Sequence, residues 1–132
     1  YYFLNQEKFK EMIEQNLFLE WAQFAGNYYG TPLSYVNEKI KKGFNVLLEI
    51  EVEGARQIKN KFPNSLSIFL LPPNKEELER RIRNRGTEKE EAIKTRLSRA
   101  NYEISVSNQF DFVLTNHNVD ETAKKIIKLI KT

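Results

Sequence analysis

The chain has no cysteine and a single histidine, His117, among its 132 residues. The lack of cysteine excludes a disulfide framework and a thiol nucleophile, and one histidine argues against a histidine-rich metal site or a Ser-His-Asp triad. No run approaches the roughly 18 apolar residues of a membrane span, and no basic-then-apolar leader opens the chain. We therefore expect a cytoplasmic protein with no membrane partner.

A glycine-rich phosphate loop ending in Lys-Ser or Lys-Thr is also missing from these residues. Such a loop is the common cradle of a nucleoside triphosphate. The composition is otherwise that of one folded unit, because 40% of the residues are hydrophobic and can fill a core.

The arginines are clustered rather than spread. Six of the seven lie in one stretch of 20 residues: Arg80, Arg81, Arg83, Arg85, Arg96 and Arg99. Planar guanidinium groups suit phosphate oxygens, whereas a solubilising face can use lysine. The alternative is a solvated helix with pairs such as Glu77 and Arg81. We expect no nucleic-acid partner, because 18 acidic residues interleave with the 21 basic ones and no aromatic stacking motif accompanies them.

The first third of the chain predicts a small antiparallel lobe. Asn5 can cap a helix whose apolar residues recur at helical spacing. Residues 18–25 are aromatic and of strand length, and Gly26-Asn27 has turn chemistry, so a second strand is expected to return from Tyr28. A helix then ends near Gly43.

The remainder alternates between strands and helices. Residues 46–50 are almost continuously apolar, which predicts a central parallel strand covered on both faces. The elements expected after it are a helix over 52–61, a strand over 66–71, a helix capped by Asn74, a helix from 87 to about 106, a strand over 112–114 and a last helix capped by Asp120. This alternation indicates an α/β fold with a parallel sheet. Three strands are few for such a sheet, so we expect a truncated chain whose first strand would precede Tyr1.

Two sets of carboxylates are candidates for chemistry. Glu49 and Glu51 lie at the carboxyl end of the predicted central strand, where open α/β sheets bind ligands. Alternatively, these two glutamates have a structural role, in which they pair with Arg56 or cap the next helix. Glu20 lies between Leu19 and Trp21, and a carboxylate there can accept two hydrogen bonds from guanine N1 and N2, a pair of donors that adenine lacks. Its alternative is a solvent-facing side chain.

Five motifs in order make the chain similar to the guanylate kinase family almost from end to end. They are Glu20-Trp21, the run from Gly26 to Thr31, Leu48-Glu49-Ile50-Glu51 with Gly54-Ala55, Ile68-Phe69 with Pro72-Pro73, and Arg81 through Arg85-Gly86-Thr87. The resemblance implies a P-loop-kinase-like parallel sheet core, N-terminally truncated, with a small mixed β lobe for GMP and a helical lid. It divides the chain into a GMP-binding lobe (1–43), core (44–73), helix and lid (74–99) and C-terminal core (100–132).

The resemblance also implies an activity, the transfer of the ATP γ-phosphoryl group to GMP with Mg²⁺. It does not indicate an oligomeric state. The residues it implies for GMP are Glu20, Thr31 and Glu51 at the base, with Tyr1 and Tyr29 at the phosphate. Arg81, Arg85 and Arg96 would be the catalytic and lid arginines. Glu49 would lie near the magnesium shell, and Asn116 would line the adenine site.

The chain departs from the family pattern at three places. Glu49 and Glu51 replace an aspartate pair, the family's Asn-Asp-Asp after the last strand is Asn116-His117-Asn118, and the phosphate loop would precede Tyr1. We therefore expect the intact enzyme to be active and these 132 residues alone to be inactive. The alternative function is a non-catalytic guanylate-kinase-like domain that binds a protein partner on the GMP surface.

Overall fold

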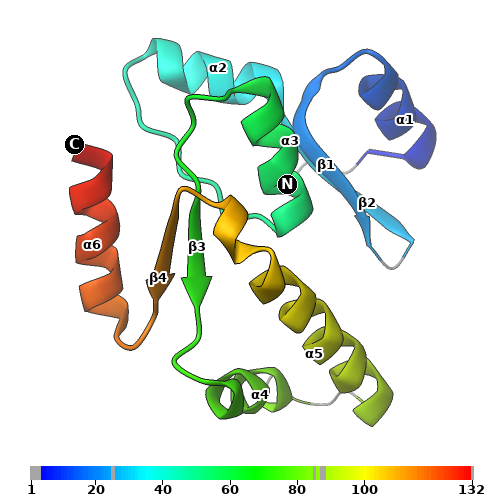
Figure 1. Cartoon of the computed structure of the whole chain (residues 1–132). Helices are drawn as coiled ribbons and strands as arrows, with labels where there is room; N and C mark the ends of the chain where they lie inside the picture. Colours follow the sequence, from blue (N-terminus) through cyan, green and yellow to red (C-terminus); the bar gives the residue numbers. More distant parts are fainter. Residues whose placement is uncertain (1–3, 25, 85, 87–88, 132) are drawn as a thin grey trace. The chain divides into compact units, whose positions relative to one another are not determined.

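The computed structural model describes residues 4–24, 26–84, 86 and 89–131. They form two compact units, Tyr1–Ser65 and Leu66–Thr132. In Figure 1 the colours follow the chain from the blue helix of the first unit to the red helix of the second. The predicted division of the chain into four segments stays a prediction.

The first unit is a β-hairpin surrounded by helices. Its elements are α1 (Gln6–Glu14), β1 (Phe18–Phe24), β2 (Asn27–Pro32), α2 (Leu33–Lys41) and α3 (Val52–Lys61). The strands are antiparallel, and the turn between them includes Gly26 with φ of 81°, a conformation that glycine adopts at no steric cost. The predicted antiparallel lobe is confirmed.

Aromatic rings hold α1 against the hairpin. Asn5 caps α1, since its Oδ1 accepts a hydrogen bond from the Lys8 N–H at 2.7 Å. The helix then presents Phe9, whose ring stacks on Phe18 at 4.4 Å between centroids and lies 5.1 Å from the Tyr28 ring. Phe9 and Phe18 are both buried, so this stack is part of the core of the unit.

Polar side chains of α3 fasten the helix along β1. Gln57 accepts from the Trp21 N–H at 2.9 Å and donates to the Trp21 carbonyl at 2.8 Å, as a neighbouring strand would. Lys61 Nζ donates to the carbonyls of Phe18 at 2.6 Å and Leu19 at 3.3 Å. These contacts satisfy backbone groups of β1 that β2 does not pair, so α3 has a fixed register on the strand.

The second unit contains a parallel strand pair. Its elements are β3 (Ile68–Leu71), α4 (Lys75–Arg83), α5 (Glu90–Ser105), the 3₁₀ turn η1 (Ser107–Gln109), β4 (Phe112–Thr115) and α6 (Val119–Lys131). β3 and β4 run side by side with Ile68 opposite Phe112 (Figure 1), and α4 and α5 lie in the connection between them. A crossover of this kind is what parallel strands require. Asn74 caps α4 as predicted, accepting from the Glu77 N–H at 2.7 Å.

Three predictions about elements were wrong. Residues 44–51 form no regular secondary structure, and the described parallel sheet has two strands rather than three. A strand needs hydrogen-bonding partners along its edge, and no described strand pairs with this segment; Leu47 is 77% exposed, so the run is not covered on both faces. The cap of α6 is Asn118 rather than Asp120, because Asn118 Oδ1 accepts from the Glu121 N–H at 3.2 Å.

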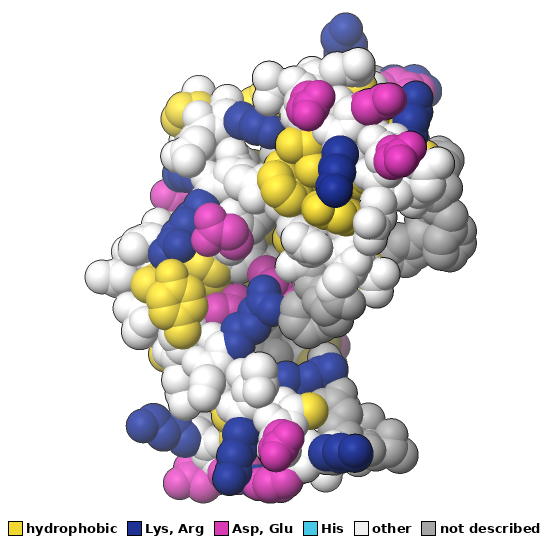
Figure 2. All heavy atoms as spheres, turned by 90° about the vertical axis from the view of Figure 1, so that its right-hand side faces the viewer, with side chains coloured by type: hydrophobic (Ala, Val, Ile, Leu, Met, Phe, Trp, Pro, Cys, Tyr) yellow, Lys and Arg dark blue, Asp and Glu magenta, His cyan; other side chains and the backbone are white. Residues whose placement is uncertain are grey.

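The surface carries mixed charge. On the face that Figure 2 shows, Lys and Arg side chains are interspersed with Asp and Glu side chains. Within the described ranges, no helix has both the length and the apolar character needed to cross a membrane.

Candidate nucleotide site

The predicted purine selector is buried and paired. Glu20 on β1 lies directly opposite Thr31 on β2, so both side chains project from the same face of the hairpin. The Thr31 hydroxyl donates to Glu20 Oε1 at 2.7 Å, and Glu20 is only 8% exposed. The alternative of a solvent-facing glutamate is therefore wrong. A buried carboxylate with one hydroxyl donor still has acceptor capacity for further N–H groups.

The first turn of α3 closes against the same carboxylate. Gly54 is buried, and a Cβ atom added to it would lie 3.0 Å from Glu20 Oε2. The lack of a side chain at this position thus allows the helix to approach the carboxylate. The N-terminal end of a helix also favours a nearby negative charge.

Tyr29 shares the face of the hairpin that bears Glu20. It lies opposite Ala22, two residues from Glu20, and it is 51% exposed. Tyr28 lies on the opposite face, where its ring packs with Phe9 and Trp21. The alternation of side chains along a strand therefore separates the two tyrosines: Tyr28 packs among aromatic rings, and Tyr29 leaves its side chain exposed on the face of Glu20.

The acidic residues before α3 are exposed. Glu51 occupies the N-cap position of α3 without a side-chain capping hydrogen bond, and Glu49 lies two residues before it in the irregular segment. The capping alternative is therefore not supported. Arg56 Nη1 pairs with Glu53 Oε2 at 3.1 Å. No group of three or more His, Asp or Glu side chains that could hold a metal occurs in the part of the chain that the structure describes.

In the second unit, α4 presents its arginines in pairs with acidic residues. Glu77 Oε1 accepts from Arg81 Nε at 2.9 Å, and the same carboxylate binds Arg80 through two hydrogen bonds. The hydrogen bond from Arg80, with a further one from Arg81, lowers the pKa of Glu77 to about 2. The predicted Glu77–Arg81 pair is thus present, and it holds Arg81 on the helix surface.

Arg83 joins α4 to α5. Its guanidinium group forms a bidentate pair with Glu90 at 2.7 and 2.9 Å, and its Nε binds Glu79 at 3.0 Å. The hydrogen bond from Arg83 lowers the pKa of Glu90, and the two carboxylates raise the pKa of Arg83. The pair links the helix that carries Arg81 to the helix that carries Arg96. Arg96 itself is half-buried.

Asn116 follows β4 at the carboxyl end of the parallel pair. Its N–H donates to the Leu71 carbonyl at 2.8 Å, and its Oδ1 accepts from the hydroxyl of the buried Thr122 at 3.0 Å. Asn116 therefore ties β3 and α6 together, a role that its position in the sequence did not reveal. The predictions for Tyr1 and Arg85 lie outside the described residues.

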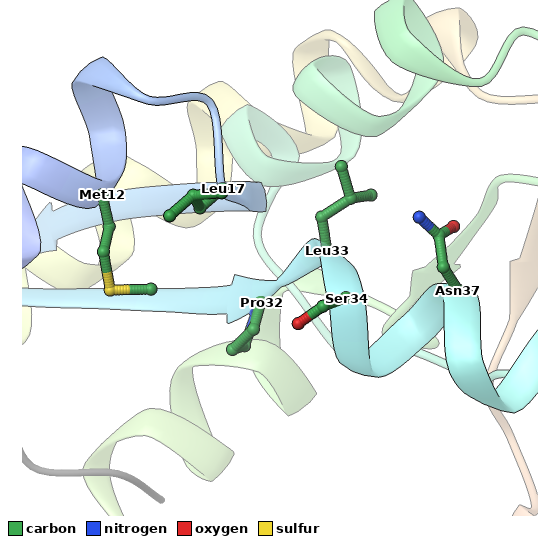
Figure 3. Close-up of a pocket in the computed structure, with 6 residues that line it drawn as sticks. All are labelled: Met12, Leu17, Pro32, Leu33, Ser34 and Asn37. Carbon is green, nitrogen blue, oxygen red and sulfur yellow. The ribbon is translucent and has the colours of Figure 1, made fainter.

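A cavity of about 270 Å³ lies elsewhere in the first unit (Figure 3). It is lined by Met12 of α1, Leu17, Pro32 and three residues of α2, Leu33, Ser34 and Asn37. None of these side chains is charged, so the cavity offers no cation for a phosphate group. It includes none of the predicted site residues.

Sequence reasoning missed the residues of α3 that hold the site together. Gly54, Gln57 and Lys61 follow one another at i, i+3 and i+7, which places them on one face of the helix. All three face β1: Gly54 at Glu20, Gln57 at Trp21 and Lys61 at Phe18. The spacing was visible in the sequence, but a stripe of glycine and polar residues does not by itself indicate a buried contact.

The family model described as Guanylate kinase matches residues 1–132. Guanylate kinase of Prochlorococcus marinus strain MIT 9312 is 87% identical over 132 residues, which are 100% of this chain and 72% of that protein. That of Prochlorococcus marinus subsp. pastoris is 79% identical over the same lengths.

The fold is similar to a solved structure as well. The crystal structure of guanylate kinase from Anaplasma phagocytophilum matches with a TM-score of 0.79 and 32% identity, covering 99% of this chain and 63% of that one. The predicted fold class, a kinase-like α/β core with a small β lobe and helices, is confirmed by this similarity.

Proposed function

This chain belongs to the guanylate kinase family, and on that premise we propose that the protein transfers the γ-phosphoryl group of ATP to GMP, giving GDP and ADP. An oxygen of the GMP phosphate attacks the γ-phosphorus while the bond to the β–γ bridging oxygen breaks. The observation that carries the proposal is the buried Glu20–Thr31 pair, a carboxylate fixed on one face of a hairpin by a 2.7 Å hydrogen bond.

Guanine recognition follows from the chemistry of this pair. Guanine presents the N1–H and N2–H donors side by side, and the carboxylate of Glu20 accepts both, whereas adenine has an unprotonated N1 and would leave the acceptors unmatched. Thr31 keeps the carboxylate oriented. Glu51, at the exposed N-terminal end of α3, supplies a second acceptor for the base.

Tyr29 is the proposed ligand of the GMP phosphate in the described part of the chain. Its half-exposed hydroxyl lies on the same face as Glu20, so one nucleotide can meet both. We assign the same role to Tyr1. A hydroxyl donor binds a phosphate oxygen without adding charge, which leaves the neutralisation of charge to cationic groups.

The arginines are proposed to act on the transferring phosphoryl group. Phosphoryl transfer requires mainly positioning and cationic stabilisation, and one such arginine is worth roughly 10³–10⁵ in rate. We assign this role to Arg81, Arg85 and Arg96. Arg81 is paired with Glu77, so we expect it to exchange this carboxylate for phosphate oxygens when the nucleotides bind.

ATP and magnesium complete the proposed site. Mg²⁺ is usually held by one or two carboxylates and by substrate phosphates rather than by an all-protein cage, which fits an exposed Glu49 that acts through water. When bound, the ion would neutralise charge on the phosphates. Asn116, at the carboxyl end of β4, is the proposed contact of the adenine base.

The test is an acceptor panel with the intact protein. We expect ADP formation from ATP with GMP and only background rates with AMP, CMP or UMP. Tyr29→Phe should raise the KM for GMP about tenfold, the equivalent of one lost hydrogen bond of about 1.4 kcal/mol. Tyr35→Phe is the matched control, because Tyr35 is equally exposed at 52% and lies on α2. Binding of a phosphopeptide without turnover of GMP would instead support the protein-interaction alternative.

A further inference from the structure

The first turn of α3 places Gly54, a residue without a side chain, against the carboxylate of the proposed guanine site. We propose that Gly54 is a positioning residue for the Glu20 carboxylate and that its missing side chain sets the preference for guanine. The inference rests on the proposed function, since it concerns the same site. Gly54 would not touch the nucleotide; it would act through Glu20.

The space around Gly54 is closed on two sides. A Cβ atom at this position would lie 3.0 Å from Glu20 Oε2 and 3.4 Å from Ile50 Cδ1. The first distance is shorter than an ordinary van der Waals contact, so a neighbour has to shift by a few tenths of an ångström, whereas the second distance is an ordinary contact. An alanine methyl group must therefore move the carboxylate or the helix.

The carboxylate cannot move without losing a partner. Thr31 holds its Oε1 at 2.7 Å, so a rotation that takes Oε2 away from Gly54 also disturbs this hydrogen bond. The group is thus held at one oxygen by a donor and bounded at the other by the helix backbone. A shift of a few tenths of an ångström is smaller than the displacement of about 1 Å that can cost about 100-fold, so we expect a loss of affinity of up to about tenfold.

The helix cannot easily move either. Gln57 makes two hydrogen bonds to the backbone of Trp21, and Lys61 reaches the carbonyls of Phe18 and Leu19. These contacts lie on the same face of α3 as Gly54 and fix its register along β1. A methyl group at position 54 will therefore displace mainly the Glu20 side chain.

Gly54→Ala should therefore weaken the binding of GMP while it stabilises α3. Alanine is the better helix former, so Gly54→Ala favours α3 locally while it disturbs Glu20. We expect the Kd for GMP, measured by titration calorimetry, to rise about three- to tenfold with little change for AMP. Asn60→Ala is the matched control, because Asn60 is exposed on the same helix; its Kd for GMP should stay within about twofold of wild type.

A second variant separates this effect from a loss of fold. Glu20→Asp shortens the side chain by one methylene and withdraws the carboxylate from position 54. In that background, Gly54→Ala should cost much less GMP affinity than in the wild type, a coupling that a general destabilisation would not produce.

The inference is overturned by either of two results. One is a Gly54→Ala protein that binds GMP within about twofold of wild type; the other is an additive double variant. If the wild-type protein itself shows no affinity for GMP, the proposed function fails too. If the wild type binds GMP and Gly54→Ala changes nothing, this inference fails alone.

Discussion

Replacing Thr31 by valine removes the hydroxyl that holds Glu20 while keeping the shape of the side chain. The 2.7 Å hydrogen bond to Glu20 Oε1 is lost. Because Glu20 is only 8% exposed, water cannot fully replace the missing donor. A hydrogen bond to a charged group contributes about 1.5–3 kcal/mol, and we expect the free energy of unfolding to fall by about this amount.

Thermal unfolding followed by circular dichroism measures the change. For a chain of this size, 1 kcal/mol corresponds to a shift in Tm of about 3–5 °C, so Thr31→Val should lower Tm by about 5–15 °C. GMP affinity should fall as well, since the carboxylate loses its orientation. Thr95→Val is the matched control: the Thr95 hydroxyl donates to the Glu91 carbonyl on the surface of α5, and its loss should cost under about 0.5 kcal/mol.

The reasoning would be refuted by a Thr31→Val protein as stable as the Thr95→Val control. Such a result would mean that Glu20 finds another partner or that water reaches it. A loss of stability with unchanged GMP affinity would keep the pair as a structural contact and remove it from nucleotide recognition.

Two further predictions concern the contacts of α4 and α3. The hydrogen bonds from Arg80 and Arg81 lower the pKa of Glu77 from 4.5 to about 2, so its stabilising contribution is present above pH 4.5 and is lost as the pH falls through about 2. In urea unfolding, Glu77→Gln should be less stable than wild type at pH 7, and most of this difference should be gone at pH 2. A difference as large at pH 2 as at pH 7 would count against this pairing. Gln57→Leu should lower the free energy of unfolding by about 1–3 kcal/mol, because it leaves the N–H and carbonyl of Trp21 unpaired. Gln23 is exposed on β1, and an equal loss of stability in Gln23→Leu would contradict the role given to Gln57.

Local signals predicted most of the elements. α3 spans the residues expected from its pattern, and α4 begins where the side chain of Asn74 can cap it. The hairpin turns at Gly26, where a positive φ is needed. These features depend on a few neighbouring residues, which is why the sequence alone indicates them.

The incorrect or missing predictions depended on distant partners. The apolar run at 46–50 has the composition of a central strand, but forming a strand also takes a neighbour to pair with. The pairing of Glu20 with Thr31 continues the register that begins at the turn with Phe24 opposite Asn27, and the irregularity between Phe18 and Glu20 shifts only the pairing beyond it, of Phe18 with Pro32. The amino-acid composition does not indicate where such a shift in strand register occurs.

The candidate site residues were predicted by resemblance, whereas the residues that position them could be recognised only from the structure. The family motifs pointed to Glu20, Thr31 and Tyr29, and the structure places all three on one face of the hairpin. Gln57 and Lys61 look like solvent-exposed residues of a polar helix in the sequence. Only the geometry reveals that they bind the backbone of β1 and bring Gly54 against Glu20.

The most direct test of guanine selection by Glu20 is the ratio of kcat/KM for GMP to that for AMP in wild type and Glu20→Gln. The amide has an NH₂ donor in place of one carboxylate oxygen. One hydrogen bond with guanine is therefore lost, and at that position two N–H donors face each other. We predict a fall in the ratio of about 100-fold or more, with no fall for Glu14→Gln, an exposed glutamate on α1. A ratio unchanged by Glu20→Gln would contradict the assignment of Glu20 as the residue that selects guanine.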